Sequence, residues 1–163
     1  DSRSASMGEG INVLVAAQML IDNPQIILDE LARKTAEWAS RTRVFGALDT
    51  LENLKKGGRV SGAKAFFASA LAIKPIVEVR EGKIMEGGKE RTRSKALALL
   101  IEKVKSAGPI SNLAVLHAQC ADLDMFLEQL KSVYSGEIIV GEVGSVIGSH
   151  TGVGTMGVTF HVK

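Results

Sequence analysis

The sequence predicts an α/β fold in which helices are layered on a mixed sheet that contains an antiparallel hairpin. Segments with helical apolar periodicity alternate with short apolar runs typical of strands. Near the middle of the chain, two alternating segments flank Glu81-Gly82, a pattern that indicates a hairpin. With 163 residues, 45% of them hydrophobic and 23% charged, the chain can bury the core of one domain.

The first two predicted helices differ in how much of their surface is apolar. Apolar residues cover most of the circumference of Met7 to Ile21, which predicts a helix buried on several sides, with Ser6 as its N-cap. Asn23-Pro24 is typical of an N-cap followed by proline at the first helical position. We therefore expect a second, amphipathic helix from there to about Arg41.

A strand and a short helix come next and lead to a pair of glycines. The apolar run Arg43 to Leu48 predicts the strand, and Leu51 to Lys56 the helix. At Gly57-Gly58 the first glycine is predicted to supply the left-handed residue that ends the helix, so the second is not needed for this stop. Ala63 to Ala72, rich in alanine and phenylalanine, predicts a largely buried helix.

The remaining elements complete the sheet and its covering helices. The hairpin comprises Ile73 to Arg80 and Lys83 to Glu86. The other predicted elements are a helix from Thr92 to Ala107 stopped by Gly108-Pro109, a strand from Asn112 to His117, a helix starting at Ala121-Asp122, and strands from Glu137 to Val140 and from Gly157 to Val162.

The stretch from Ser149 to Gly157 carries the strongest chemical signal. It places one imidazole, three hydroxyls and three glycines in nine residues, which suits close approach by an anion or a carboxylate. Gly152 to Gly157 matches G-x-G-x-x-G, but a strand follows it instead of a helix, which excludes that type of dinucleotide site. Ser149 beside His150 leaves a small Ser/His hydrolase open, although adjacent residues rarely point toward one another.

Composition argues against several other classes of protein. The net charge is only +2 and aromatic residues are scarce, which disfavours a nucleic-acid partner. No His, Cys or carboxylate pairs have metal-ligand spacing, and nothing indicates a cofactor. The single cysteine, Cys120, excludes an intrachain disulfide. The apolar runs are too short to cross a bilayer and no signal peptide is recognisable, so we expect a cytoplasmic protein.

The arginines of two segments each admit two interpretations. Arg59 follows the doubled glycine, which could aim its guanidinium, whereas spacing alone favours a solvated surface arginine. Arg91 to Lys95 is the densest basic run and is most simply a solvated face. Cations at a helix start oppose the helix dipole, so a docked phosphate or acidic partner is the alternative.

Seven short motifs, in order along the whole chain, together resemble the DegV family of bacterial fatty-acid-binding proteins, which includes the binding subunits of fatty acid kinase. In this sequence they are Asp1-Ser2, Ser6-x-Gly8-x-Gly10, Asp49-Thr50-Leu51-x-x-Leu54-x-x-Gly57-Gly58-Arg59-Val60-Ser61, Ile73-Lys74-Pro75-Ile76, Gly82-Lys83, Arg91-Thr92-Arg93 and His150-Thr151-Gly152-x-Gly154. The last motif departs from the family's usual His-Thr-Gly-Pro-Gly because Val153 replaces proline, which reduces the rigidity of the turn but removes no donor.

The resemblance implies a substrate-presenting protein that is not itself an enzyme. It implies that residues 1–22 are a linking segment and helix from a missing N-terminal domain and that residues 23–163 are the C-terminal lipid-binding domain. The acyl chain would lie in an apolar tunnel between the domains. The carboxylate would be held by His150, supported by Arg59, with Thr151, Gly152 and Gly154 as weaker candidates. Serine and threonine hydroxyls from the missing domain would complete this site.

The resemblance also implies a partner, the catalytic subunit of a fatty acid kinase, met by a surface that carries Arg91 or Arg93. It allows peripheral contact with a membrane. Two alternatives stay open: a partner-docking domain without lipid binding, and the Ser149-His150 hydrolase.

Overall fold

A computed structural model describes residues 1–59 and 73–163, and it contains a six-stranded mixed sheet. The strands follow the order β3-β2-β1-β6-β4-β5. All neighbouring pairs are antiparallel except β4 and β5, which run parallel. The strands are β1 (Thr42–Ala47), β2 (Lys74–Arg80), β3 (Lys83–Glu90), β4 (Ile110–His117), β5 (Ile139–Glu142) and β6 (Met156–Val162).

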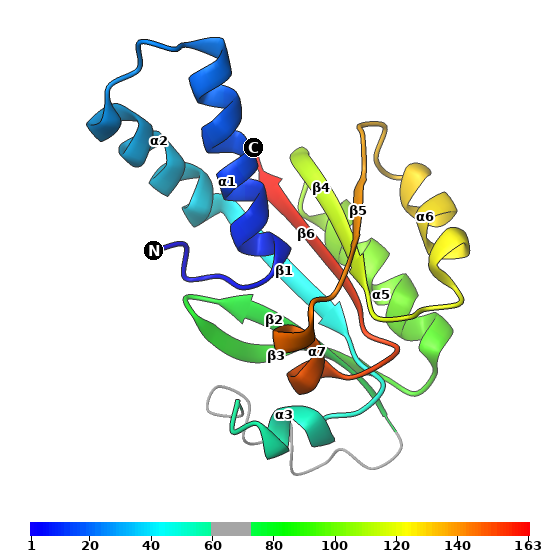
Figure 1. Ribbon diagram of the computed structural model, residues 1–163. Helices are drawn as coiled ribbons and strands as arrows, with labels where there is room; N and C mark the ends of the chain where they lie inside the picture. Colours follow the sequence, from blue (N-terminus) through cyan, green and yellow to red (C-terminus); the bar gives the residue numbers. More distant parts are fainter. Residues whose placement is uncertain (60–72) are drawn as a thin grey trace.

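Helices cover both faces of the sheet (Figure 1). The described residues form α1 (Met7–Asp22), α2 (Leu28–Arg41), α3 (Glu52–Lys56), α5 (Arg93–Ser106), α6 (Leu123–Lys131) and α7 (Ser145–Thr151). On one face α5 packs against the strands and α6 packs beside it, whereas α1 and α2 lie against the other face. The short helices α3 and α7 contact each other near one end of the sheet. The predicted layered α/β fold with a mixed sheet is therefore confirmed.

The main core lies between the sheet and the face covered by α5 and α6. Because side chains alternate along a strand, every second residue of the central strands points into this core. Its fully or almost fully buried members are Phe45, Ala47, Ile76, Ala96, Leu97, Leu100, Val104, Leu113, Val115, Phe126, Leu130, Met156, Val158 and Phe160. The alternate residues of β1, β2 and β6 are left for the opposite face.

The predicted hairpin is confirmed, including its turn. Glu81 and Gly82 connect β2 to β3 with φ angles of 51° and 73°. Two successive positive φ values define a type I′ turn, whose twist matches that of the flanking strands. Pro75 lies at the second position of β2, consistent with its expected place at a strand start.

The N-terminal helices differ from prediction in burial and in length. In α1 only Gly8, Ile11 and Asn12 are buried, so the expected burial on several sides is wrong for the described structure. Val13 and Ile21 are 62% and 70% exposed, because the sheet and α2 cover only part of the helix.

Among the described helices none has the length and apolarity needed to span a bilayer.

The second helix begins later than predicted because Asn23 caps a turn and not the helix. Its side-chain oxygen accepts a hydrogen bond from the Gln25 N–H at 3.2 Å, and its carbonyl accepts one from the Ile26 N–H at 3.0 Å. Ile27 is extended, and α2 starts at Leu28. The side chain of Ser6 makes no capping hydrogen bond to α1.

Two further differences from the prediction lie at the end of α3 and at α7. Gly58, not Gly57, takes the left-handed conformation after α3, with φ of 72°. The helix α7 was not among the predicted elements, because Gly148 and the β-branched residues within it give little sequence signal for a helix. The predicted helix Ala63 to Ala72 lies outside the described residues.

Candidate ligand pocket

A pocket opens on the face of the sheet opposite the main core. Its floor includes the alternate residues of the central strands, among them Val44, Gly46 and Gly157. Gly46 of β1 and Gly157 of β6 are directly paired in the strand register. Since neither has a side chain, the pocket is deeper where the two strands meet, which leaves room for an extended apolar group.

The rest of the pocket comes from several other parts of the chain. The segment before α1, strand β2, the hairpin turn and the helices α3 and α7 supply its walls, and its volume is about 340 Å³. The apolar lining includes Val77, Val79, Ile84, Leu116, Val143, Val146, Ile147 and Val158. The pocket is therefore largely apolar, with its polar groups contributed by a few side chains.

Two of these polar side chains lie against Gly57. The ring of His150 packs so closely on this glycine that a Cβ there would overlap the ring nitrogen Nδ1. Arg59 Nη1 donates a hydrogen bond to the carbonyl oxygen of Gly57 at 2.7 Å, and Arg59 itself is exposed. Both His150 and Arg59 line the pocket. The structure thus brings together an imidazole and a guanidinium that are 91 positions apart in the sequence.

The other predicted site residues shape the turn after α7. The Thr151 hydroxyl donates to the carbonyl of Ile147 at 3.2 Å. Gly152 and Gly154 have φ angles of 85° and 80°, which favour glycine. Their N–H groups donate to the carbonyls of Gly148 and Ala118, each at 2.8 Å. These donors already have partners within the fold, so the three residues act mainly through the shape of the loop.

The two arginines predicted for a partner surface lie in different environments. Arg91 is exposed at the end of β3, before α5. Arg93 is the first residue of α5, and its guanidinium turns inward to an ion pair with Asp122, 2.8 Å between Nε and Oδ2. Arg93 Nη1 also donates a hydrogen bond to the carbonyl of Gly154. Only Arg91 therefore presents its side chain freely to solvent.

Several buried polar atoms at the pocket lack a partner among the described residues. These are Oγ of Ser4, Nδ1 of His150 and Oγ1 of Thr159. Buried polar groups in folded proteins are nearly always hydrogen-bonded, so we expect these three atoms to find partners beyond the described residues, such as a ligand or water.

The geometry does not assemble a hydrolase from Ser149 and His150. The Ser149 hydroxyl donates to the carbonyl of Val146 at 2.8 Å on the exposed side of α7. Neighbouring residues of a helix point about 100° apart, and only His150 lines the pocket. In residues 1–59 and 73–163 no cluster of three or more His, Cys, Asp or Glu side chains could hold a metal ion.

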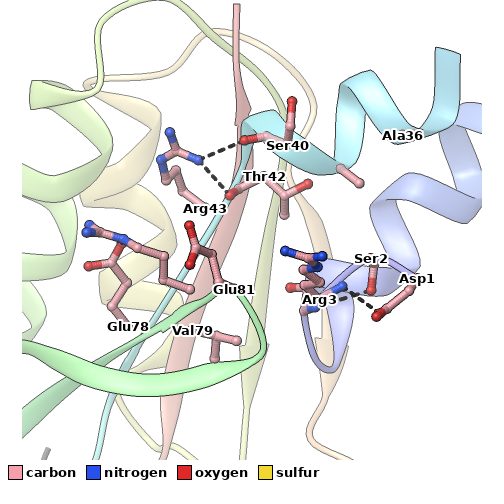
Figure 2. A pocket seen from close by; sticks show the side chains of 13 residues that line it. Asp1, Ser2, Arg3, Ala36, Ser40, Thr42, Arg43, Glu78, Val79 and Glu81 are labelled. Atoms are coloured by element: carbon pink, nitrogen blue, oxygen red, sulfur yellow. Dashed lines mark hydrogen bonds and ion pairs between the residues drawn. The ribbon is translucent and has the colours of Figure 1, made fainter. Parts of the chain in front are cut away.

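A second pocket, shown in Figure 2, is larger but more polar. It lies between the N-terminal segment, the end of α2 and the β2 hairpin, with a volume of about 470 Å³. Arg80 pairs with Glu78 at 2.8 Å, and Arg43 donates to the carbonyls of Ser40 and Thr42 at 3.3 and 2.9 Å. Because two of its three arginines are engaged and its lining offers less apolar surface than that of the first pocket, we place the candidate site in the first pocket.

Sequence reasoning missed the residues that make room for the site. Gly46 and Gly157 lie within apolar strands, and Gly57 was assigned to a helix stop. A glycine inside a strand pattern does indicate a close approach or an open space, which is the signal that could have identified the floor. Ser4 and Thr159 carried no distinguishing pattern.

Fold and site together define an α/β protein with a largely apolar pocket that His150 and Arg59 help to line. The family model described as "Uncharacterised protein, DegV family" matches residues 1–163. The chain therefore belongs to the DegV family.

Known relatives agree with this assignment over the whole chain. A DegV domain-containing protein of Streptomyces coelicolor is 36% identical over 163 residues, which cover 97% of this chain and 57% of the relative. Among solved structures, the fatty-acid-binding DegV of Bacillus subtilis is 32% identical with a TM-score of 0.82, over 100% of this chain and 59% of that one. A Thermus thermophilus DegV family protein, described by its fatty acid binding, is 29% identical with a TM-score of 0.86, over 100% and 60%.

Two facts follow from these likenesses. The solved relatives are described as fatty-acid-binding proteins, which agrees with the expectation of a binding role. The chain spans about three fifths of the length of the relatives that it matches.

Proposed function

We propose that this chain forms the C-terminal part of a protein that binds a long-chain fatty acid and presents its carboxylate to a separate kinase. One observation carries the proposal: His150 and Arg59 both lie against Gly57 and line an apolar pocket whose floor contains the paired glycines Gly46 and Gly157. A pocket of this kind matches an amphipathic ligand with one anionic end.

The two ends of such a ligand would be bound by different forces. Each methylene taken from water contributes about 0.8 kcal/mol, so a long acyl chain on the apolar floor supplies most of the affinity. The carboxylate would accept hydrogen bonds from the His150 ring, with the Arg59 guanidinium adding positive charge. Thr151, Gly152 and Gly154 would hold the α7 end in position, as their internal hydrogen bonds suggest.

The length of the relatives supports a second, preceding domain. We propose that residues 1–22 link to it and that residues 23–163 form the lipid-binding domain. The preceding domain would cover the exposed apolar side of α1 and supply serine and threonine hydroxyls to the carboxylate. The Ser4 and Thr159 hydroxyls beside the pocket have no partner among the described residues, which is consistent with a site completed by a further domain.

The binding proposal is tested by His150→Ala in the intact protein. Losing one hydrogen bond to a charged group costs about 1.5–3 kcal/mol, so we expect the dissociation constant for oleate to rise about ten- to a hundredfold. Isothermal titration calorimetry measures the affinity, and circular dichroism checks that the fold is unchanged. An unaltered affinity would remove His150 from the head-group site.

The partner-docking alternative without lipid binding is tested on the wild-type protein. Native mass spectrometry of gently purified intact protein should reveal a co-purifying long-chain fatty acid. If none is present and added oleate does not bind, the docking alternative replaces the carrier proposal.

Presentation to a kinase assigns a different task to Arg91, which is exposed and outside the pocket lining. Arg91→Ala should leave oleate affinity within about twofold but lower the rate at which the kinase phosphorylates the bound fatty acid by about tenfold, the effect of losing one charged contact. Lys131→Ala, which removes an exposed cation from α6, is the matched control. Loss of oleate affinity in Arg91→Ala would contradict this assignment.

We place this activity in the cytoplasm, where the acyl ligand would be exchanged during peripheral contact with a membrane. A protein recovered entirely with the membrane fraction at high salt would contradict this location.

A further inference from the structure

Arg93 connects three parts of the chain that are distant in sequence. Its guanidinium forms a two-point contact with Asp122, with Nε to Oδ2 at 2.8 Å and Nη2 to Oδ1 at 2.9 Å. Nη2 also lies 3.2 Å from the sulfur of Cys120, and Nη1 lies 3.6 Å from Oδ1 of Asp49. The contact with Asp122 raises the pKa of Arg93 above its ordinary value and lowers that of Asp122. This side chain is thus committed to an internal network, and it is only 24% exposed.

The same guanidinium holds the turn that directly follows α7. Nη1 of Arg93 donates to the carbonyl of Gly154. The turn is further fixed because the Gly154 N–H donates to Ala118 at 2.8 Å and the Thr155 hydroxyl donates to the Gly152 carbonyl at 2.7 Å. A Cβ at Gly154 would overlap the carboxylate of Asp49. The turn is therefore held against the ends of β1 and β4 from two sides.

We propose that Arg93 is a positioning residue for the fatty-acid head-group site, acting on His150 through the Gly152–Thr155 turn. His150 lies one residue from the end of α7, and Gly152 is the C-cap of that helix. Fixing the turn therefore fixes the end of α7 that places the imidazole against Gly57. This inference rests on the proposed role of His150 in carboxylate binding.

The geometry favours this role over direct contact with a partner protein. The three guanidinium nitrogens all have partners: Nε and Nη2 on Asp122, and Nη1 on Gly154. The planar fork of arginine makes these contacts simultaneously, which a lysine ammonium cannot do. Reaching a partner would require breaking the network.

A double-mutant cycle in the intact protein tests the inference. Oleate affinity is measured for Arg93→Gln alone and combined with His150→Ala. If Arg93 acts through His150, Arg93→Gln weakens binding about tenfold in the wild-type background and less than about twofold when His150 is absent. Lys95→Gln removes an exposed cation from the same helix turn and should leave affinity unchanged in both backgrounds.

Other outcomes overturn the inference in distinguishable ways. Equal losses in both backgrounds would mean that Arg93 stabilises the fold generally and does not act through His150. No loss from Arg93→Gln, together with a loss from His150→Ala, would reject the inference and leave the proposed function standing. No loss of oleate affinity in His150→Ala would reject both the inference and the proposed role of His150. If Arg93→Gln does not fold, Asp122→Asn weakens the same ion pair and is measured in the same cycle with the same expected pattern.

Discussion

Two adjacent glycines at the end of α3 perform separate tasks. Gly58 has φ of 72°, its N–H donates to Lys55, and the Arg59 N–H donates to Leu54, which together form a Schellman helix stop. Gly57 has an ordinary φ of −77° but leaves space for the His150 ring. One glycine is needed for its backbone conformation and the other for the absence of a side chain.

This division predicts different effects for two alanine substitutions. Gly57→Ala fits the backbone but would displace His150, so we expect oleate affinity to fall about tenfold or more with little loss of stability. At Gly58 a Cβ would meet no neighbouring atom, but alanine is strained in the left-handed conformation. For Gly58→Ala we therefore expect a loss of about 1 kcal/mol in unfolding free energy and unchanged oleate affinity. Calorimetric binding and urea unfolding measure the two quantities, and the reverse pattern would contradict the assignment.

At the scale of elements, the sheet serves two purposes because its faces differ. The face toward α5 and α6 is filled by large side chains such as Phe45, Met156 and Phe160. On the opposite face the β1 and β6 strands present the paired glycines Gly46 and Gly157. The period of two along each strand therefore separates the residues that fill the core from those that line the pocket.

Filling this floor should reduce lipid binding without weakening the strand. A Cβ at Gly46 would lie 3.7 Å from the Val77 side chain, so alanine fits and valine extends into the groove. We expect oleate affinity to fall from wild type to Gly46→Ala to Gly46→Val, by about tenfold for valine, which displaces about two methylenes. Thermal stability should be maintained or raised, because valine favours strands. An unchanged affinity in Gly46→Val would place the acyl chain elsewhere.

At the scale of the whole molecule, a buried histidine joins α1 to the sheet. The His161 ring is fully buried in β6; its Nε2 donates to Asn12 of α1 at 3.1 Å and its Nδ1 accepts from Asn112 of β4 at 3.0 Å. Trp38 of α2 packs against the ring with centroids 4.9 Å apart. These contacts suit the neutral ring, and burial lowers the pKa of His161 to about 4.

The network predicts a loss of stability in acid. Between pH 6.5 and about 4 the unfolded chain binds a proton at His161 that the folded protein does not, so the unfolding free energy falls as the pH falls, by up to about 3 kcal/mol. His161→Gln should be less stable at pH 7, but its unfolding free energy should fall less over this window. The reason is that glutamine does not bind the one proton that His161 takes up on unfolding. Urea unfolding across this pH range measures it, with exposed Lys131→Gln as control. Parallel curves for wild type and His161→Gln would reject the prediction.

Local patterns determined most of the fold. Periodicity and turn chemistry are properties of neighbouring residues, so the strands, the Glu81-Gly82 turn and the helices α5 and α6 could be predicted. Ser149 to Gly157 was also identified as chemically unusual from composition alone. The helix α7 could not be predicted, since Gly148 and its β-branched residues disfavour a helix and packing against α3 supports it.

The sequence by itself determined the layered α/β class and the family to which its motifs belong, and it predicted His150 as a site residue. Only the tertiary structure decided that Gly57 accommodates the imidazole, that Gly46 faces Gly157 and that Arg93 turns inward. The physical reason is that each of these features depends on a contact between residues far apart in the chain. Such contacts are fixed when strands pair and helices pack, and no local pattern records which side chain a glycine must leave room for.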